Sequence, residues 1–206
     1  MTKSESALPR VLLVAEGASE LGAAPSAQRG ALAALVARLL DRELEVECQR
    51  VSSPNVQIHR GHGAGFTKRA LAWIRYAQRE GFDAIVLLID HDGDAERQTQ
   101  LDVAQRDAHF SLPRALSVAI RTFDAWMLAD EKALSQVLGC RVEKQKSPED
   151  MSDPKAACRR LRERASESLN LPELYRRLSE QLALDLLEYN CPQGFGQFAQ
   201  RVRGLF

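Results

Sequence analysis

The stretch that decides the fold is "AIVLLIDHDGD", residues 84–94. Residues 84–89 are continuously apolar, which is typical of a strand covered on both faces of a parallel sheet. The run ends in Asp90, Asp92 and Asp94, which lie two residues apart and carry like charges. Because like charges this close together raise one another's pKa and destabilise a fold, the cluster needs a counter-charge. We expect a cation from outside the chain to supply it.

Three other stretches have the pattern of strands. Residues 11–16, "VLLVAE", repeat the buried design and end in Glu16. Residues 44–51 alternate apolar and polar side chains, which is typical of a strand with one solvated face. Residues 116–124 predict a fourth strand, with Asp124 at its end. Because the carboxyl ends of parallel strands share one edge of the sheet, we expect Glu16 and Asp124 to converge on the aspartate cluster.

Helical periodicity fills the intervals between these strands. The predicted helices span residues 26–41, 67–80, 97–109 and 125–138. The alternation of strand and helix predicts an α/β fold with a mostly parallel sheet flanked by helices. Residues 141–154 are polar and contain prolines, and from residue 154 onward the pattern is helical. We therefore expect an α/β domain over residues 1–140 and a helical C-terminal cap over 141–206, packed on that domain.

The composition limits the class of protein. The chain has 206 residues, with 28 Lys and Arg against 28 Asp and Glu, so that attraction to nucleic acid would require a local basic patch. No apolar run approaches the ~20 residues of a membrane span, and the first residues do not have the pattern of a secretory signal. The four cysteines are scattered without a CxxC pair, which favours reduced thiols. We expect a cytoplasmic protein with no membrane partner.

Four motifs together resemble a known family. "VAEGASE" (14–20) and "IDHDGD" (89–94) look like the Toprim signature, in which one strand carries a Glu and another an Asp-x-Asp. With "FDAWMLAD" (123–130) and "CPQGFGQF" (191–198) added, they resemble the DUF4276 family of bacterial Toprim-like proteins. The resemblance spans almost the whole chain, and it implies a Toprim-like fold.

The resemblance also implies a metal-dependent centre of the nuclease type that uses Mg²⁺ or Mn²⁺. Its implied catalytic residues are Glu16, Asp90 and Asp92, and Glu16 is the general base or acid. The implied metal ligands are these three with Asp94 and Asp124, and Glu20 supports them from outside. Asp124 departs from the Glu that the family pattern has at this place. Members of the wider group are often found with ATPase partners in phage-defence systems.

Two basic stretches are candidates for binding a phosphate backbone. Residues 59–79 combine glycines with the start of a basic helix, and we expect Lys68, Arg69 and Arg75 to contact nucleic acid. His59 and His62, in the same stretch, are possible hydrogen-bond donors. Residues 159–164, "RRLRER", are either a solvated helix face or a surface for a partner or nucleic acid. The expected substrate is nucleic acid, DNA rather than RNA.

Other interpretations of the aspartate cluster remain open. Acids after a strand can simply precede a helix N-terminus, where negative charge is favourable. An EF-hand loop starting at Asp90 is excluded, because Ala95 and Leu101 stand where Gly and Glu are needed. A phosphatase of the haloacid-dehalogenase type expects Thr at Asp94 and is an alternative. The main prediction is metal-dependent phosphodiester hydrolysis in bacterial defence; the other alternative is a non-catalytic Toprim-like partner of an ATPase.

Overall fold

Four parallel strands form the centre of the protein, for which a computed structural model describes residues 7–22, 30–54, 56 and 65–206. The strands are β1 (Arg10–Ala15), β2 (Glu45–Arg50), β3 (Ala84–Asp90) and β4 (Arg114–Ala119). They pair in the order β2-β1-β3-β4, and every pair is parallel. The predicted α/β class with a parallel sheet is confirmed, and the arrangement is consistent with a Toprim-like fold.

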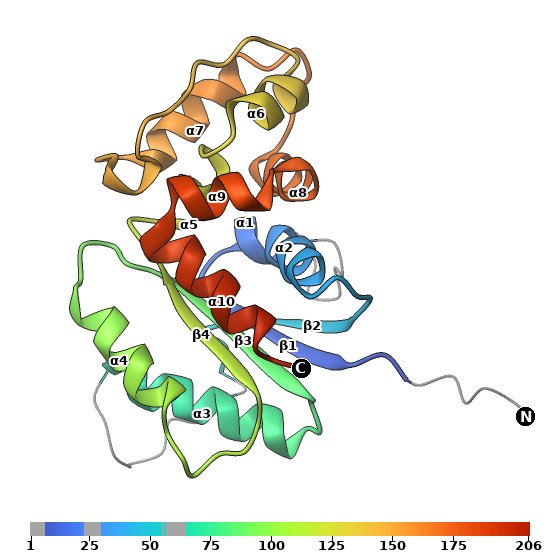
Figure 1. Ribbon diagram of the computed structural model, residues 1–206, viewed down its shortest axis with the longest axis vertical. Coiled ribbons are helices and arrows are strands. Elements are labelled where there is room, and N and C mark those ends of the chain that lie inside the picture. Colours follow the sequence, from blue (N-terminus) through green and yellow to red (C-terminus); the bar gives the residue numbers. More distant parts are fainter. Residues whose placement is uncertain (1–6, 23–29, 55, 57–64) are drawn as a thin grey trace, which may run out of the picture.

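Helices cover both faces of the sheet. On one face lie α3 (Gly65–Arg79) and α4 (Glu96–Gln105), and on the other lie α2 (Ala31–Leu40) and α10 (Gln197–Arg203) (Figure 1). Alternate residues of the inner strands serve the two faces: Leu12 packs in the cluster that contains Trp73, and Leu13 packs in the cluster that contains Leu35. The continuous apolar runs of the sequence therefore reflect burial on both faces.

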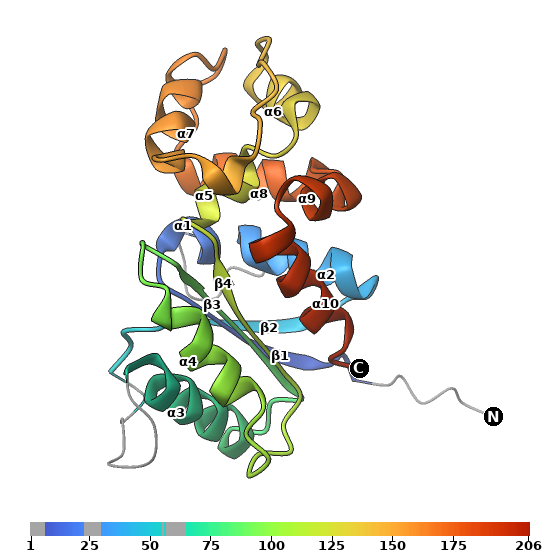
Figure 2. The same ribbon diagram turned by 60° about the vertical axis from the view of Figure 1, so that its left-hand side comes forward.

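The remaining helices lie beyond the carboxyl ends of the strands. They are α1 (Ala18–Leu21), α5 (Phe123–Met127), α6 (Glu131–Leu138), η1 (Pro148–Asp150), α7 (Pro154–Glu163), α8 (Leu171–Gln181), α9 (Leu184–Asn190) and the π-helical turn η2 (Pro192–Gly196). Figures 1 and 2 show them stacked at one end of the sheet, from which α10 returns to the sheet face. There the Arg201 guanidinium donates to the Leu116 carbonyl and to the Asp102 carboxylate. The C-terminal segment thus contributes to the core as well as covering the strand ends.

The predicted strand over residues 116–124 is wrong at its end. β4 stops at Ala119, and Arg121 has a φ of 61°, which a strand cannot accommodate. The main chain turns here because the Asp92 N–H donates to the Arg121 carbonyl, at 3.1 Å. Asp124 consequently lies in the first turn of α5 and not on a strand.

The predicted helix over residues 125–138 is in fact two helices. α5 ends at Met127, and α6 begins after Asp130, whose carboxylate accepts the N–H groups of Lys132 and Ala133. This N-cap fixes a new helix start in the middle of the predicted helix. Of the predicted helix over 26–41, the described part is α2, and residues 26–29 lie outside the described residues, as do His59 and His62.

Two bulk features of the described chain bear on its class. Within the described residues, no helix is both long enough and apolar enough to cross a membrane. Cys48, Cys140, Cys158 and Cys191 are all free thiols.

A buried carboxylate joins the polar segment before α7 to the C-terminal turn η2. Glu149 is 6% exposed, and it accepts the N–H groups of Gln193 at 3.0 Å and Gly194 at 2.6 Å. Burial raises the pKa of Glu149, and the amide hydrogen bonds oppose that rise. The close approach of these two segments depends on the missing side chain at Gly194. A Cβ atom there would lie 2.6 Å from Glu149 Oε1 and 2.9 Å from Ile120 N.

Gly194→Ala should therefore lower the free energy of unfolding by about 1–3 kcal/mol, because the added methyl group overpacks a closed site. Gly196→Ala is the matched control, since Gly196 has helical dihedrals and its Cβ would approach no atom nearer than 3.9 Å. Urea unfolding of both variants measures the difference. Equal stability of the two would contradict this account of the turn.

Candidate active site

Asp90, the last residue of β3, is bonded from three directions. Its N–H donates to Glu16 Oε2, at 2.9 Å, just beyond the end of β1. Its carbonyl accepts from Arg97 Nη1 of α4 at 2.5 Å, and its Oδ1 accepts the Phe123 N–H of α5 at 2.8 Å. The ends of two strands and the starts of two helices are therefore held together at one residue.

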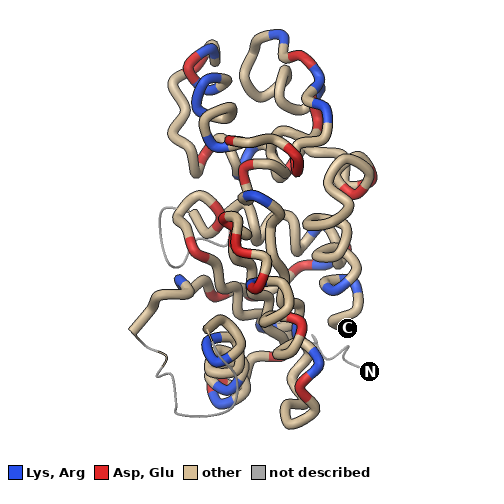
Figure 3. The backbone as a smooth tube through the Cα atoms, turned by 90° about the vertical axis from the view of Figure 1, so that its left-hand side faces the viewer, with Lys and Arg blue, Asp and Glu red and all other residues tan. Residues whose placement is uncertain are grey.

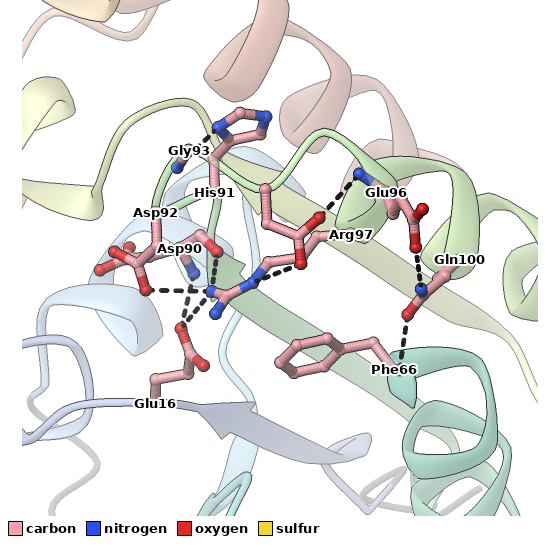
Figure 4. Close-up of polar contacts among 10 residues, drawn as sticks. Glu16, Phe66, Asp90, His91, Asp92, Gly93, Glu96, Arg97 and Gln100 are labelled. Carbon is pink, nitrogen blue, oxygen red and sulfur yellow. Dashed lines mark hydrogen bonds and ion pairs between the residues drawn. The ribbon is translucent and has the colours of Figure 1, made fainter. Parts of the chain in front are cut away.

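Arg97 supplies positive charge to the outer carboxylates. Its Nη1 lies 3.5 Å from Glu16 Oε2 and 3.0 Å from Asp92 Oδ2, and its Nε lies 3.8 Å from Asp94 Oδ2 (Figure 4). The guanidinium also lies over the Phe66 ring, with Cζ 4.9 Å from the centroid. The side chain of Arg97 is only 17% exposed. The expectation that relief must come from outside the chain is thus wrong for these outer acids, because the chain provides its own cation.

The sequence contains a signal for Arg97 that the motif analysis missed. Arg97 is the second residue of α4, and a cation in the first turn of a helix is unfavourable to the helix dipole. Asp94 Oδ1 accepts the Glu96 N–H at 3.0 Å, so the interpretation of the acids as a helix-start turn does apply to Asp94. An arginine at such a position indicates that neighbouring carboxylates hold it there.

The turn between β3 and α4 sets the orientation of Asp92 and Asp94. Asp92 and Gly93 both have positive φ, 48° and 79°. The His91 N–H donates to the Ala119 carbonyl, which ties the turn to the end of β4. Aspartate tolerates the left-handed region better than most residues, and a non-glycine residue held there is a form of local strain that is common at functional sites.

A second, inner group of carboxylates forms no ion pair with a cation among the described residues. It consists of Glu20 on α1, Asp90 and Asp124, which interact electrostatically with one another. Glu20 is 8% exposed, and its Oε2 has no hydrogen-bond partner among the described residues. Burial raises the pKa of Glu20, and the charges of Asp124 and Glu16 add to the rise. Glu20 was predicted to support the metal ligands from outside, whereas in the structure its side chain is buried within the acidic centre.

Asp124 is held by the C-terminal helices. It is 5% exposed, and its Oδ1 accepts a short hydrogen bond from the Tyr175 hydroxyl of α8. The Cys158 thiol of α7 donates to the Asp124 carbonyl at 3.6 Å. Burial raises the pKa of Tyr175, so the phenol remains a proton donor to Asp124. Tyr175 was not predicted, because nothing in its local sequence points across fifty residues to Asp124.

The donor chemistry of the inner group fits a hard divalent cation. Mg²⁺ and Mn²⁺ prefer carboxylate oxygens, and an unpartnered buried carboxylate oxygen indicates charge that the chain leaves uncompensated. Asp90, Glu20 and Asp124 would hold the ion. Within the described part of the chain, no three or more acidic, His or Cys side chains are already arranged as a metal-ion cage. The fit of the site to a divalent cation therefore rests on the three carboxylates and on the unpartnered Glu20 oxygen.

The structure separates the predicted basic residues. Lys68 and Arg69 lie in the first turns of α3, next to Phe66 and hence near Arg97. Arg69 also lines a small pocket at the end of β2 with Ser52 and Trp73. Arg75 is about 14 Å further along the helix than Phe66, at 1.5 Å per residue, and its guanidinium lies over the Phe110 ring. Arg75 is therefore remote from the acidic centre.

Fold and centre define the class: an all-parallel α/β protein with buried carboxylates gathered where the strands end. The family model described as a domain of unknown function, DUF4276, matches residues 25–203. The chain belongs to this family, which confirms that part of the resemblance. No curated protein and no solved structure matches the chain.

Replacing Arg97 tests the internal counter-charge. Arg97→Gln should lower the free energy of unfolding in EDTA by about 1–2 kcal/mol, because Glu16 and Asp92 would be left without a counter-charge. Added Mn²⁺ should reduce this loss, since it can replace the missing charge. Arg79→Gln is the control, because Arg79 pairs with Glu80 at an exposed position. Thermal melts in EDTA and in Mn²⁺ measure both effects, and an undiminished melting temperature in EDTA would contradict the assignment.

The pH dependence of stability tests the inner group. Burial, with the charges of Glu20, Asp124 and Asp92, raises the pKa of Asp90 to about 8, although the Phe123 N–H opposes the rise. The folded state thus binds more protons than the unfolded state between about pH 4 and pH 8, and the stability contributed by Asp90 is lost as pH rises through this range.

Asp90→Asn removes this titration and retains an oxygen for the Phe123 N–H. In EDTA the variant should match wild type near pH 4 and exceed it at pH 8 by about 1 kcal/mol or more. Urea unfolding at both pH values measures the difference. Parallel pH profiles for the two proteins would show that Asp90 does not titrate in this way.

Proposed function

We propose that the protein hydrolyses phosphodiester bonds of nucleic acid, DNA rather than RNA, with Mg²⁺ or Mn²⁺ bound at the acidic centre. The observation that carries the proposal is the inner group of carboxylates, with an unpartnered Glu20 oxygen and a raised Asp90 pKa. A bound divalent cation supplies neutralising charge for the phosphoryl group and orients the attacking water.

The chain's own residues have separable roles in this reaction. Among the described residues, the contacts of Glu16 all use Oε2, so that its Oε1 is available to take a proton from water as a general base. The Asp90 N–H and Arg97 fix the orientation of Glu16. Tyr175 orients Asp124 through its hydroxyl. The helices beyond the strands bury Asp124 and Tyr175, which strengthens the electrostatic interactions of Asp124.

The biological setting is part of the proposal and rests on the Toprim resemblance alone. In that setting the protein is cytoplasmic, has a Toprim-like catalytic centre and works with an ATPase partner in bacterial defence.

A specific observation favours a second candidate function. Arg97 already pairs with Glu16, Asp92 and Asp94, as expected of an acidic centre kept for structure. The protein would then be a non-catalytic partner of an ATPase, and metal would leave it inactive. The two candidates differ in whether the purified protein cuts nucleic acid.

Nicking of supercoiled plasmid in Mn²⁺ tests the main proposal. Wild type should nick the plasmid, and both Asp90→Asn and Asp92→Asn should reduce the initial rate by more than the about 10–100-fold typical of residues that only support a metal ligand. Asp185→Asn is the matched control, since Asp185 is an exposed aspartate on α9. An inactive wild type would favour the non-catalytic candidate. Equal activity in Asp90→Asn would refute the site.

A further inference from the structure

Helix α7 has one apolar side, which is seated on α5. Its buried residues are Pro154, Ala157, Cys158 and Leu161. The Cys158 thiol bonds to the main chain of Asp124, so the helix is fixed directly against a residue of the acidic centre. Asp153 caps the helix, with its carboxylate accepting the Ala156 N–H at 2.8 Å. The position of α7 relative to the centre is therefore defined by both hydrogen bonds and packing.

The outer side of α7 carries a row of three cations. Lys155, Arg159 and Arg162 are spaced i, i+4, i+7, which places them on one helix face. None of them has a hydrogen bond or ion pair with any residue that the structure describes. On α8, by contrast, Arg176 and Arg177 both pair with Glu173. Like charges at this spacing repel one another, so an unneutralised row indicates a partner outside the chain.

The row begins at the acidic centre. The positive charge of Lys155 acts on Glu20, where it opposes the burial that raises the pKa of that carboxyl. In both Figure 1 and Figure 2, α7 lies farther from the sheet than α5 and α1. Figure 3 shows Lys and Arg positions, together with Asp and Glu positions, at the end of the molecule where α7 lies. From Lys155 to Arg162 the row extends about 10 Å, at 1.5 Å per residue.

A polyanion cannot approach the centre without such a row. The centre holds six carboxylates, those of Glu16, Glu20, Asp90, Asp92, Asp94 and Asp124, and its one arginine is committed to three of them. Phosphates would be repelled unless positive charge lay along their path. A length of about 10 Å corresponds to about three phosphates of one strand, at 3.4 Å of axial rise each.

We propose that Lys155, Arg159 and Arg162 of α7 form the surface that binds the phosphate backbone and leads one strand of nucleic acid into the acidic centre. This inference rests on the proposed function, because it assigns the surface that presents the substrate to that same centre. It gives the C-terminal segment a role in substrate binding. The sequence-predicted residue Arg75, which lies remote from the centre, has no part in this surface.

Binding in EDTA tests the surface independently of cleavage. Fluorescence anisotropy with end-labelled single-stranded and duplex 20-mers gives affinity as a function of salt concentration. The variant Lys155→Gln, Arg159→Gln, Arg162→Gln should bind at least about tenfold more weakly. Its slope of log affinity against log salt should be smaller by about 2 for the single strand and about 3 for the duplex, since each lost phosphate contact removes about 0.7 or 0.9.

The matched control removes the same three charges elsewhere. Arg176→Gln, Arg177→Gln, Arg203→Gln takes arginines that are already paired with Glu173 and Glu188, so its salt slope should equal that of wild type. Circular dichroism and thermal melting establish that both triple variants fold. The proposal is overturned if the α7 variant keeps the wild-type slope, as it would if the row docked on an acidic protein, or if wild type binds neither probe.

Two cleavage assays separate this proposal from the proposed function. The α7 variant should lose plasmid nicking, whereas the control triple variant should nick plasmid and hydrolyse bis(p-nitrophenyl) phosphate in Mn²⁺ at the wild-type rate. If wild type cleaves neither substrate, hydrolysis fails, while the salt slopes still decide the role of α7. If both triple variants lose nicking equally, net charge is responsible and the α7 surface is refuted.

Discussion

Parallel strands that end in acids bring those acids to one edge of the sheet, and the rest of this structure depends on how their charge is accommodated. Asp90 is at the focus, because its N–H, carbonyl and carboxylate bond respectively to Glu16, Arg97 and Phe123. Those three bonds fix where β1 ends and where α4 and α5 begin. The electrostatic cost of the site is thus coupled directly to the fold, because moving Asp90 would break the hydrogen bonds that position α4 and α5.

The C-terminal helices complete this arrangement and do more than cover the strand ends. Tyr175 donates to Asp124, and Cys158 bonds to its main chain, so α7 and α8 both contact the centre directly. Their burial of Asp124 and Glu20 lowers the local dielectric, which strengthens repulsion among the acids and attraction to any cation that enters. The same packing also places η2 and Glu149 close to the end of β4, where Gly194 approaches Ile120. The turn η2 and the end of β4, which are far apart in the sequence, are therefore held together by the packing of the C-terminal helices.

The sequence predicted the strands well because their signal is local. The apolar run of residues 84–90 coincides with β3, and β2 lies within the predicted 44–51. The end of β4 could not be predicted, because the turn at Arg121 is fixed by a hydrogen bond from Asp92, which lies in the turn between β3 and α4. The acids of the site were found because strand ends converge by topology. Tyr175 was missed because its partner is remote in sequence. Arg97 was missed because its role as a counter-charge depends on which carboxylates surround it in the fold.

The centre is electrically asymmetric, and this asymmetry bears on function. On the outer side Arg97 forms ion pairs with Glu16, Asp92 and Asp94 in a partly exposed position, where such pairs contribute only modestly to stability. On the inner side Asp90 and Asp124 are buried with amide and hydroxyl donors, which favour ionised carboxylates less than a cation would. The charge of Lys155 only partly opposes the burial of Glu20, whose pKa is still raised. Structure alone would be served better by apolar residues on that side, because uncompensated buried charge is costly. The retention of three acids there is explained if a bound cation supplies the missing charge.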